Sequence, residues 1–286
     1  MERQNQVRWK LQLKLDLIIM TLIVQLSDTH ISRPGELAYG RIDTSTFLRQ
    51  AVTVIQRLPQ RPDAVVITGD LVDRGQAEEY RQLKDLLTPL DPVPVYLLPG
   101  NHDDRATLRD AFPEQPAWMS GGFAQYSVPI GTMQLIALDT VVPRRDQGHL
   151  CSERLAWLDN ALGQCSERPT LIALHHPPFR TLIDGMDEIG LIEGAAELEA
   201  IVQRHPHVHG LISGHMHRHI QTGFAHTRAI VAPSTAHQVA LDLAPDAPLA
   251  WTLEPPGLLL HAFSPEGRLV THEMTTLAFA GPFPFV

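Results

Sequence analysis

The segment SGHMHRH at positions 213–219 places three histidines, His215, His217 and His219, at alternate positions. Residues two apart point to different sides of a helix but to the same face of an extended strand. Because imidazole is a common metal ligand, the spacing indicates a metal-binding group presented by a strand end or a loop. The competing interpretation is that these are solvated loop residues in a chain with 15 histidines.

Four further polar clusters each follow a short apolar run directly. Taken singly, each cluster could be no more than a turn or a helix cap. In α/β proteins, however, ligands collect beyond the carboxyl ends of the strands, so five such clusters are expected to converge on one edge of a sheet. The four segments are SDTH at 27–30, TGDLVDRG at 68–75, PGNHDD at 99–104 and LHHPPF at 174–179.

The elements that must position these clusters alternate along the first two thirds of the chain. Short apolar runs predict strands buried on both faces, and amphipathic segments between them predict helices. This alternation favours an α/β architecture with a largely parallel sheet, and GLLLHAF and RLVTHEM near the end predict a hairpin or meander. Strands are expected at 22–26, 64–68, 95–98, 134–138, 170–174 and 210–213, and helices at 44–58, 76–87, 105–111, 153–162 and 195–204.

Composition narrows the classes of partner. The net charge of −9 disfavours long polyanions such as nucleic acid polymers, and no stretch reaches the roughly 18 uncharged apolar residues of a membrane helix. Cys151 and Cys165 show no CxxC spacing, which indicates two reduced thiols in a cytoplasmic protein.

Residues 1–19 join a basic start to an apolar run, as a secretory signal does. Asp16 lies close to that run, however, and no small-residue cleavage site follows before SDTH. We therefore expect an uncleaved N-terminal extension at 1–19, either an additional edge strand or a disordered tail, ahead of a single domain at 20–286.

The order D-x-H, GD, GNH, H and GHxH resembles the calcineurin-like metallophosphoesterase superfamily over about residues 20–240. The resemblance implies a four-layer αββα sandwich with two mixed β-sheets. It also implies two metal ions that share one bridging carboxylate, Asp70. One ion would be held by Asp28, His30, Asp70 and His217, and the other by Asp70, Asn101, His175 and His215.

Oxygen and imidazole ligands without thiolate suit Fe, Zn, Mn or Co, as two divalent or trivalent ions about 3.5–4 Å apart. Such a pair lowers the pKa of a bound water molecule. Two divalent ions, two carboxylates and a hydroxide leave a net charge of about +1, which attracts a phosphodiester monoanion despite the acidic surface.

The resemblance also implies roles beside the metals. His102 would stabilise the transition state and act as a general acid. The block GDLVDRG is similar to that of the Ser/Thr protein phosphatases, which implies that Asp73 supports His102 and that Arg74 binds phosphate; alternatively, residues 73–75 only form a turn. Of the two histidines in HHPP, His175 is the expected ligand, and His176 is expected to lie behind it, to face the substrate, or to be a hydrogen-bonded loop residue.

Among superfamily members, the chain is most similar to bacterial glycerophosphodiesterases and class III cyclic nucleotide phosphodiesterases. The loop at 32–41 would hold the alcohol portion of a diester through Arg33, Tyr39 or Arg41, or is a plain surface loop. His237 is expected near the metals, and His219 at the rim. The segment 238–286 would form a cap or a contact between identical subunits.

The sequence therefore predicts a cytoplasmic, homo-oligomeric phosphodiesterase that hydrolyses small phosphodiesters by in-line attack of a metal-bound hydroxide. The alternatives are a phosphomonoesterase on the same site and a metal-binding scaffold without activity. A nuclease is disfavoured because no basic patch is evident.

Overall fold

Two mixed β-sheets form the centre of the molecule in the computed structural model, which describes residues 20–115 and 122–285. The predicted extension at 1–19 lies outside the described residues. In the first sheet three parallel strands are continued by an antiparallel pair, in the order β15-β14-β1-β2-β3. These strands are β1 (Thr21–Leu26), β2 (Ala64–Thr68), β3 (Val95–Leu98), β14 (Gly257–Phe263) and β15 (Leu269–Thr275).

The second sheet has the order β10-β11-β9-β7-β5-β4, in which the four inner strands are parallel and both edge strands antiparallel. Its strands are β4 (Tyr126–Ile130), β5 (Met133–Leu138), β7 (Thr170–Leu174), β9 (Val208–Ser213), β10 (Ile220–Phe224) and β11 (Thr227–Val231). Two small ladders pair β6 (Gly148–His149) with β8 (Leu191–Glu193), and β12 (Gln238–Val239) with β13 (Trp251–Thr252).

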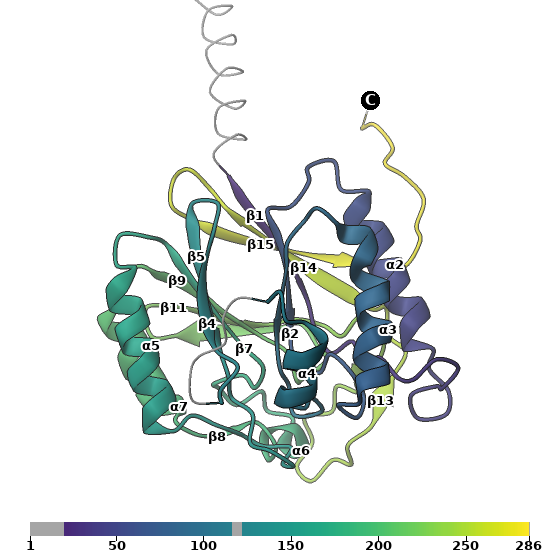
Figure 1. The fold of residues 1–286 in the computed structure, drawn as a ribbon, viewed down its shortest axis with the longest axis horizontal. Helices are drawn as coiled ribbons and strands as arrows, with labels where there is room; N and C mark the ends of the chain where they lie inside the picture. Colours follow the sequence, from purple (N-terminus) through teal and green to yellow (C-terminus); the bar gives the residue numbers. More distant parts are fainter. Residues whose placement is uncertain (1–19, 116–121, 286) are drawn as a thin grey trace, which may run out of the picture.

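Helices flank the two sheets on opposite sides of the molecule, as Figure 1 shows. Beside the first sheet lie α2 (Thr44–Gln56), α3 (Ala77–Leu87), η1 (Thr88–Leu90) and α4 (Arg105–Ala111). Beside the second lie α5 (Ser152–Gln164) and α7 (Ala195–Arg204), and the short α6 (Asp184–Asp187) follows β7.

The alternation of side chains along β1 shows how the layers are joined. Val24 and Leu26 pack with α2 and α3 in one core cluster, whereas Ile23 packs with Leu135 and Ile212 of the second sheet. A third cluster joins the outer face of the second sheet to α5 and α7. Both sheets are therefore buried on both faces, and the predicted four-layer αββα sandwich is confirmed.

The strands and helices expected from the sequence all occur, with ends within three residues of the predicted ones. The expectation of one largely parallel sheet is wrong, because the parallel strands are divided between two mixed sheets. The hairpin of β14 and β15 is confirmed, and it continues the first sheet beside β1. Within the segment 238–286, β14 and β15 therefore belong to this sheet, and residues 240–250 form a loop between β12 and β13. Among the described helices, none is long and apolar enough to cross a membrane.

A buried histidine lies at the centre of this hairpin. His261 of β14 is 1% exposed, and its Nε2–H donates to Gln25 Oε1 at 2.9 Å, while Thr271 Oγ1 lies 2.9 Å from Nδ1. Burial lowers the pKa of His261 to about 3, and the nearby His219 lowers it further, so the side chain is neutral.

Candidate metal centre

Loops that follow strands of both sheets bring the first predicted ligand group together. Four side-chain ligand atoms lie within 4.8 Å of one another, and they belong to Asp28, His30, Asp70 and His217. His30 Nε2 is 3.1 Å from His217 Nε2 and 3.5 Å from Asp70 Oδ2, and His217 Nε2 is 3.5 Å from Asp28 Oδ1. All four residues are buried, so bulk water has little access to these groups.

The second predicted group lies on the other side of the Asp70 carboxylate. His175 Nε2 is 3.5 Å from Asp70 Oδ1 and 3.0 Å from Asn101 Oδ1. The ring of His215 lies 5.1 Å from that of His175, and its buried Nε2 has no hydrogen-bond partner among the described residues. The two oxygens of Asp70 therefore face two different sets of ligands.

Hydrogen bonds to main-chain carbonyls fix the tautomers of two of these histidines. His175 Nδ1–H donates to the carbonyl of Thr68 at 2.8 Å, and His217 Nδ1–H donates to that of His237 at 3.0 Å. Each bond leaves the Nε2 lone pair directed at its ligand group, which is the orientation that metal-binding histidines require.

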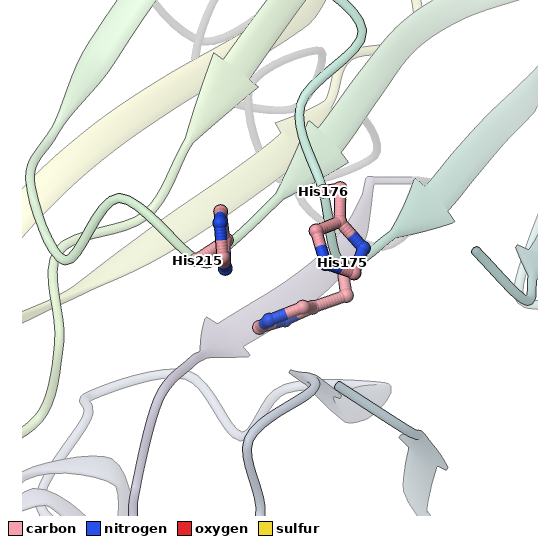
Figure 2. Close-up of side chains that lie close together, drawn as sticks. All are labelled: His175, His176 and His215. Carbon is pink, nitrogen blue, oxygen red and sulfur yellow. The ribbon is translucent and has the colours of Figure 1, made fainter. Parts of the chain in front are cut away.

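Figure 2 shows His175, His176 and His215 side by side, with ligand atoms within 4.8 Å of one another. Both nitrogens of His176 are engaged, however: Nε2–H donates to the carbonyl of Asp146 at 2.9 Å, and Thr140 Oγ1 lies 2.8 Å from Nδ1. Burial lowers the pKa of His176 to about 3, with the neighbouring His175 adding to the effect. The geometry favours His175 as the ligand and does not support the expected substrate contact of His176.

The backbone of this centre is unusual. Five of the seven predicted ligands have positive φ: Asp28 at 52°, His30 at 42°, Asp70 at 46°, His215 at 70° and His217 at 50°. Non-glycine residues rarely adopt this left-handed conformation, and such strain clusters at functional sites.

Between His215 and His217, Met216 is fully buried and packs in an apolar cluster with Ile183 and Val231. The alternate spacing of the GHMH motif thus gives two histidines to the site and one residue to the core. His219 Nδ1 lies 2.8 Å from Glu273 Oε2 of β15, which places His219 outside the two ligand groups.

Two glycines allow the loops to approach this closely. A Cβ atom on Gly100 would lie 2.2 Å from Asp70 Oδ1 and 2.3 Å from Asp70 N. A Cβ atom on Gly69, whose φ is 94°, would lie 2.3 Å from His175 Nδ1. Only glycine fits at these positions without displacing Asp70 or His175.

Burial, together with the charges of Asp28 and Asp70, determines the protonation of the ligands. Burial raises the pKa of Asp28 to about 7, and the Asp70 carboxylate adds to the shift. Burial alone would lower the pKa of His175, but the carboxylates of Asp70 and Asp28 raise it to about 9. Burial lowers the pKa of His215 and lowers that of His217 to about 4, so both rings are neutral, which is the form that binds metal ions, and the unpartnered Nε2 of His215 supplies a ligand atom. The residues present therefore fit two metal ions.

His102 lies beside this centre, with its ring 4.6 Å from that of His30. Its main-chain N–H donates to Asp70 Oδ1 at 2.9 Å, and its Nδ1–H donates to the main-chain carbonyl of Asp73 at 2.7 Å. Burial alone would lower the pKa of His102, but Asp70 and Asp73 reverse the shift and raise it. Asp73 therefore supports His102 both through its main-chain carbonyl and through its charge. The Asp73 carboxylate itself lies 3.3 Å from Arg74 Nε.

Asp103, which the sequence had not indicated as a site residue, connects two loops of the site. Asp103 Oδ2 accepts hydrogen bonds from Leu71 N at 3.0 Å and Gly100 N at 2.8 Å, and its Oδ1 accepts from Tyr80 Oη at 2.9 Å. This carboxylate joins the loop that carries Asp70 to the loop that carries Asn101. Its position inside PGNHDD was the available signal, but its partners are distant in sequence.

A cavity of about 420 Å³ opens over the ligands. His30, Asp70, Asn101, His102, His215 and His217 line one part of it, and apolar residues line another part. Tyr39 and His237 both line this cavity, as expected from the sequence. The apolar residues are Met186, Ile189, Val239, Leu249, Ala250 and Trp251.

The two predicted arginines lie elsewhere. Arg33 Nε donates to Gln76 Oε1 at 2.7 Å, and Arg33 lines a separate cavity that contains none of the predicted ligands. Arg74 lines a third cavity, of about 370 Å³, together with Asn101 and His102. The geometry therefore places Arg74, but not Arg33, beside the candidate catalytic residues.

Comparisons with known proteins agree with this geometry. A family model described as calcineurin-like phosphoesterase matches residues 21–219. The probable glycerophosphodiester phosphodiesterase GpdQ of Arcobacter nitrofigilis is 36% identical over 264 residues, covering 92% of this chain and 96% of the relative. A probable cyclic nucleotide phosphodiesterase of Rhodopseudomonas palustris is 35% identical over 265 residues, covering 91% and 93%. A solved dimetal phosphatase from Danio rerio has a TM-score of 0.59 at 16% identity, covering 90% of this chain and 99% of that one, which supports the fold alone.

Proposed function

Because the chain belongs to the calcineurin-like phosphoesterase family, we propose that it is a metal-dependent phosphodiesterase acting on small phosphodiesters. The names of its relatives support glycerophosphodiesters and cyclic nucleotides as substrate classes. The observation that carries the proposal is the position of Asp70, whose Oδ2 is 3.5 Å from His30 Nε2 and whose Oδ1 is 3.5 Å from His175 Nε2. One carboxylate thus serves two ligand groups.

We assign one metal ion to Asp28, His30, Asp70 and His217, and the other to Asp70, Asn101, His175 and His215. Their oxygen and imidazole groups suit Fe, Zn, Mn or Co. When bound, the ions supply Lewis acidity, which polarises a phosphoryl oxygen and lowers the pKa of a water molecule. The sum of two divalent ions and two carboxylates is about +2, which favours binding of a phosphodiester monoanion.

His102 is proposed to stabilise the phosphoryl oxygens and to protonate the leaving alcohol. Its bond to the Asp73 carbonyl holds the ring by Nδ1 and leaves Nε2 for a ligand in the cavity. Its raised pKa favours the protonated form that this role needs. Asp73 is proposed to position His102, Arg74 to contact phosphate from the adjoining cavity, and His237 to orient His217 through its main-chain carbonyl.

The remaining proposals concern the whole chain. We propose that residues 20–286 form one domain, that the enzyme is cytoplasmic, and that it assembles from identical subunits. The free thiols of Cys151 and Cys165 support a reducing compartment. Limited proteolysis would test the domain, cell fractionation the location, and light scattering the assembly.

The deciding experiment measures metal content and kcat/KM on purified protein. We expect two ions per chain and a higher kcat/KM for bis(p-nitrophenyl) phosphate than for p-nitrophenyl phosphate. Asp70→Ala should lose both metal and activity, and His219→Ala serves as the matched control. A strong preference for the monoester would instead identify a phosphomonoesterase, and two bound metals without activity on any diester would identify a scaffold. Glycerophosphoethanolamine and cyclic AMP would then separate the two diester classes.

A further inference from the structure

We propose that Tyr39, Leu249 and Trp251 form a binding surface for an uncharged aromatic ester arm of the substrate. This inference rests on the proposed function, because it concerns an arm of the diester whose phosphate would lie at the predicted ligands. The three residues line the same cavity as His30, Asp70 and the other ligands. Its volume of about 420 Å³ is within the range of small-molecule sites.

The charge of the cavity lining indicates what kind of arm it accepts. Away from the ligands, the lining is mainly Met186, Ile189, Val239, Leu249 and Trp251. Among the described residues that line it, there is no lysine or arginine to pair with a phosphate or carboxylate on the arm, and the charged side chains outside the ligand groups are those of Asp146 and of protonated His102, which is assigned to the reacting phosphoryl group. Burying an unpaired charge is unfavourable, so an apolar, uncharged group fits this surface.

The aromatic rings give the surface its shape. The rings of Tyr39 and Trp251 are nearly parallel, at 19° and a centroid distance of 5.6 Å. The ring of His237 meets that of Tyr39 edge-on at 5.2 Å and lies 4.6 Å from the ring of the predicted ligand His217. The aromatic surface therefore begins next to the metal ligands, and aromatic groups favour contact with such rings.

The main chain beside Tyr39 and the ring of Trp251 are held in place by the fold itself. Tyr39 follows Ala38, whose N–H and carbonyl form hydrogen bonds of 2.9 and 3.0 Å with Ile42. Trp251 belongs to β13 and packs against the apolar cluster of Ala38, Ile42 and Ala236. A rigid surface loses little conformational entropy when a ligand binds.

Tyr39 also has a feature typical of functional residues. Its φ is 51°, and it is 59% exposed. A left-handed backbone is unfavourable for a bulky residue, and so much exposed aromatic surface gains little from burial in the fold. A role in ligand binding accounts for an aromatic residue at this position.

The test is calorimetric binding of phenylphosphonate and methylphosphonate to the metal-loaded protein. Both carry the same phosphoryl group, so the ratio of their Kd values isolates the arm. We expect phenylphosphonate to bind about tenfold more tightly, since an aromatic contact contributes about 0.5–1.5 kcal/mol beyond its buried area. The ratio should fall to about two- or threefold in Tyr39→Asn, which tolerates a positive φ, and in Trp251→Leu.

Two control variants separate the surface from its surroundings. Tyr39→Phe keeps the ring and should keep the wild-type ratio. Leu37→Ala lies on the same loop but lines the separate cavity near Arg33, and should also keep it. With bis(p-nitrophenyl) phosphate, Trp251→Leu should raise KM and leave kcat unchanged, because the contact lies away from the reacting atoms.

Equal affinities for the two phosphonates in the wild type would overturn the inference. Tighter binding of phosphocholine than of phenylphosphonate would overturn it too, because it would indicate a cation site that uses Asp146. Failure of the proposed function would look different: phenylphosphonate would still bind more tightly than methylphosphonate, but no phosphodiester would be hydrolysed.

Discussion

Replacing Asp103 by alanine tests whether one carboxylate holds two ligand loops in register. The change removes the acceptor for Leu71 N, Gly100 N and Tyr80 Oη, three donors that become buried and unsatisfied. Each such donor costs about 1–3 kcal/mol, so the sum is roughly 3–9 kcal/mol. We expect the low end, about 3 kcal/mol, because water can enter the space that the side chain leaves.

One effect opposes this loss. Burial raises the pKa of Asp103 to about 7, and the Asp70 carboxylate adds to the shift, so removing the charge relieves some repulsion. The matched variant Asp103→Asn separates the two effects, because it removes the charge and keeps an acceptor oxygen. We expect Asp103→Asn to lie within about 1 kcal/mol of the wild type and Tyr80→Phe to lose about 1 kcal/mol.

The assay is urea unfolding of metal-loaded protein, with metal content measured after dialysis. Asp103→Ala should retain less than two ions per chain, because Asp70 and Asn101 follow the loops that it releases. If Asp103→Ala unfolds within about 0.5 kcal/mol of the wild type and keeps both ions, the carboxylate does not act as this bridge.

Three further predictions concern the ligands, the glycines and pH. His217→Ala should lower the metal content measured by mass spectrometry, whereas His219→Ala should leave it unchanged; equal losses would contradict the assignment. Gly100→Ala should weaken metal binding by about 10- to 100-fold in a competition with a chelator, because its Cβ would lie 2.2 Å from Asp70 Oδ1 and would displace this ligand from its orientation. The pKa of His261 is lowered to about 3 in the folded protein, against about 6.5 in the unfolded chain. Below about pH 6.5 the unfolded chain therefore binds a proton that the folded protein does not. The free energy of unfolding should fall by about 1.4 kcal/mol for each pH unit below 6.5. His261→Asn should therefore lose stability less steeply between pH 6.5 and 5 in urea unfolding, and an unchanged slope would refute this account.

The strands could be predicted because they are buried on both faces, and an uninterrupted apolar run such as Ala64–Thr68 signals this directly. Both edge strands of the second sheet were missed because they lack such a run. Ile220–Phe224 is largely exposed and contains a glycine, and Tyr126–Ile130 contains a proline, which only an edge strand accommodates. No local pattern reveals that the parallel strands are divided between two sheets, because sheet order depends on pairing between distant segments.

The candidate ligands could be predicted for a similar reason. They follow strand ends, and the family model confirms the resemblance that their order suggested. The surroundings of the site could not be predicted, because they depend on contacts across the chain. Arg33 follows two predicted ligands closely, yet it bonds to Gln76, and His176 adjoins His175, yet both its nitrogens are engaged by Thr140 and Asp146. Leu249 and Trp251 lie in the segment that was expected to form a cap or a subunit contact, but no local pattern there indicates which residues line the cavity.

The left-handed backbone of the GHMH motif has a consequence for protein engineering. The torsions of His215 and His217 are maintained by the packing of Met216 and by the bond from the main-chain N–H of His215 to Asp28. A short peptide containing SGHMHRH would lack both restraints and would relax to ordinary torsions, which turn the two rings away from their partners. Inserting the sequence of the motif into another protein would therefore not reproduce the predicted metal site. The host protein must also provide the loop conformation and the two sheets that impose it.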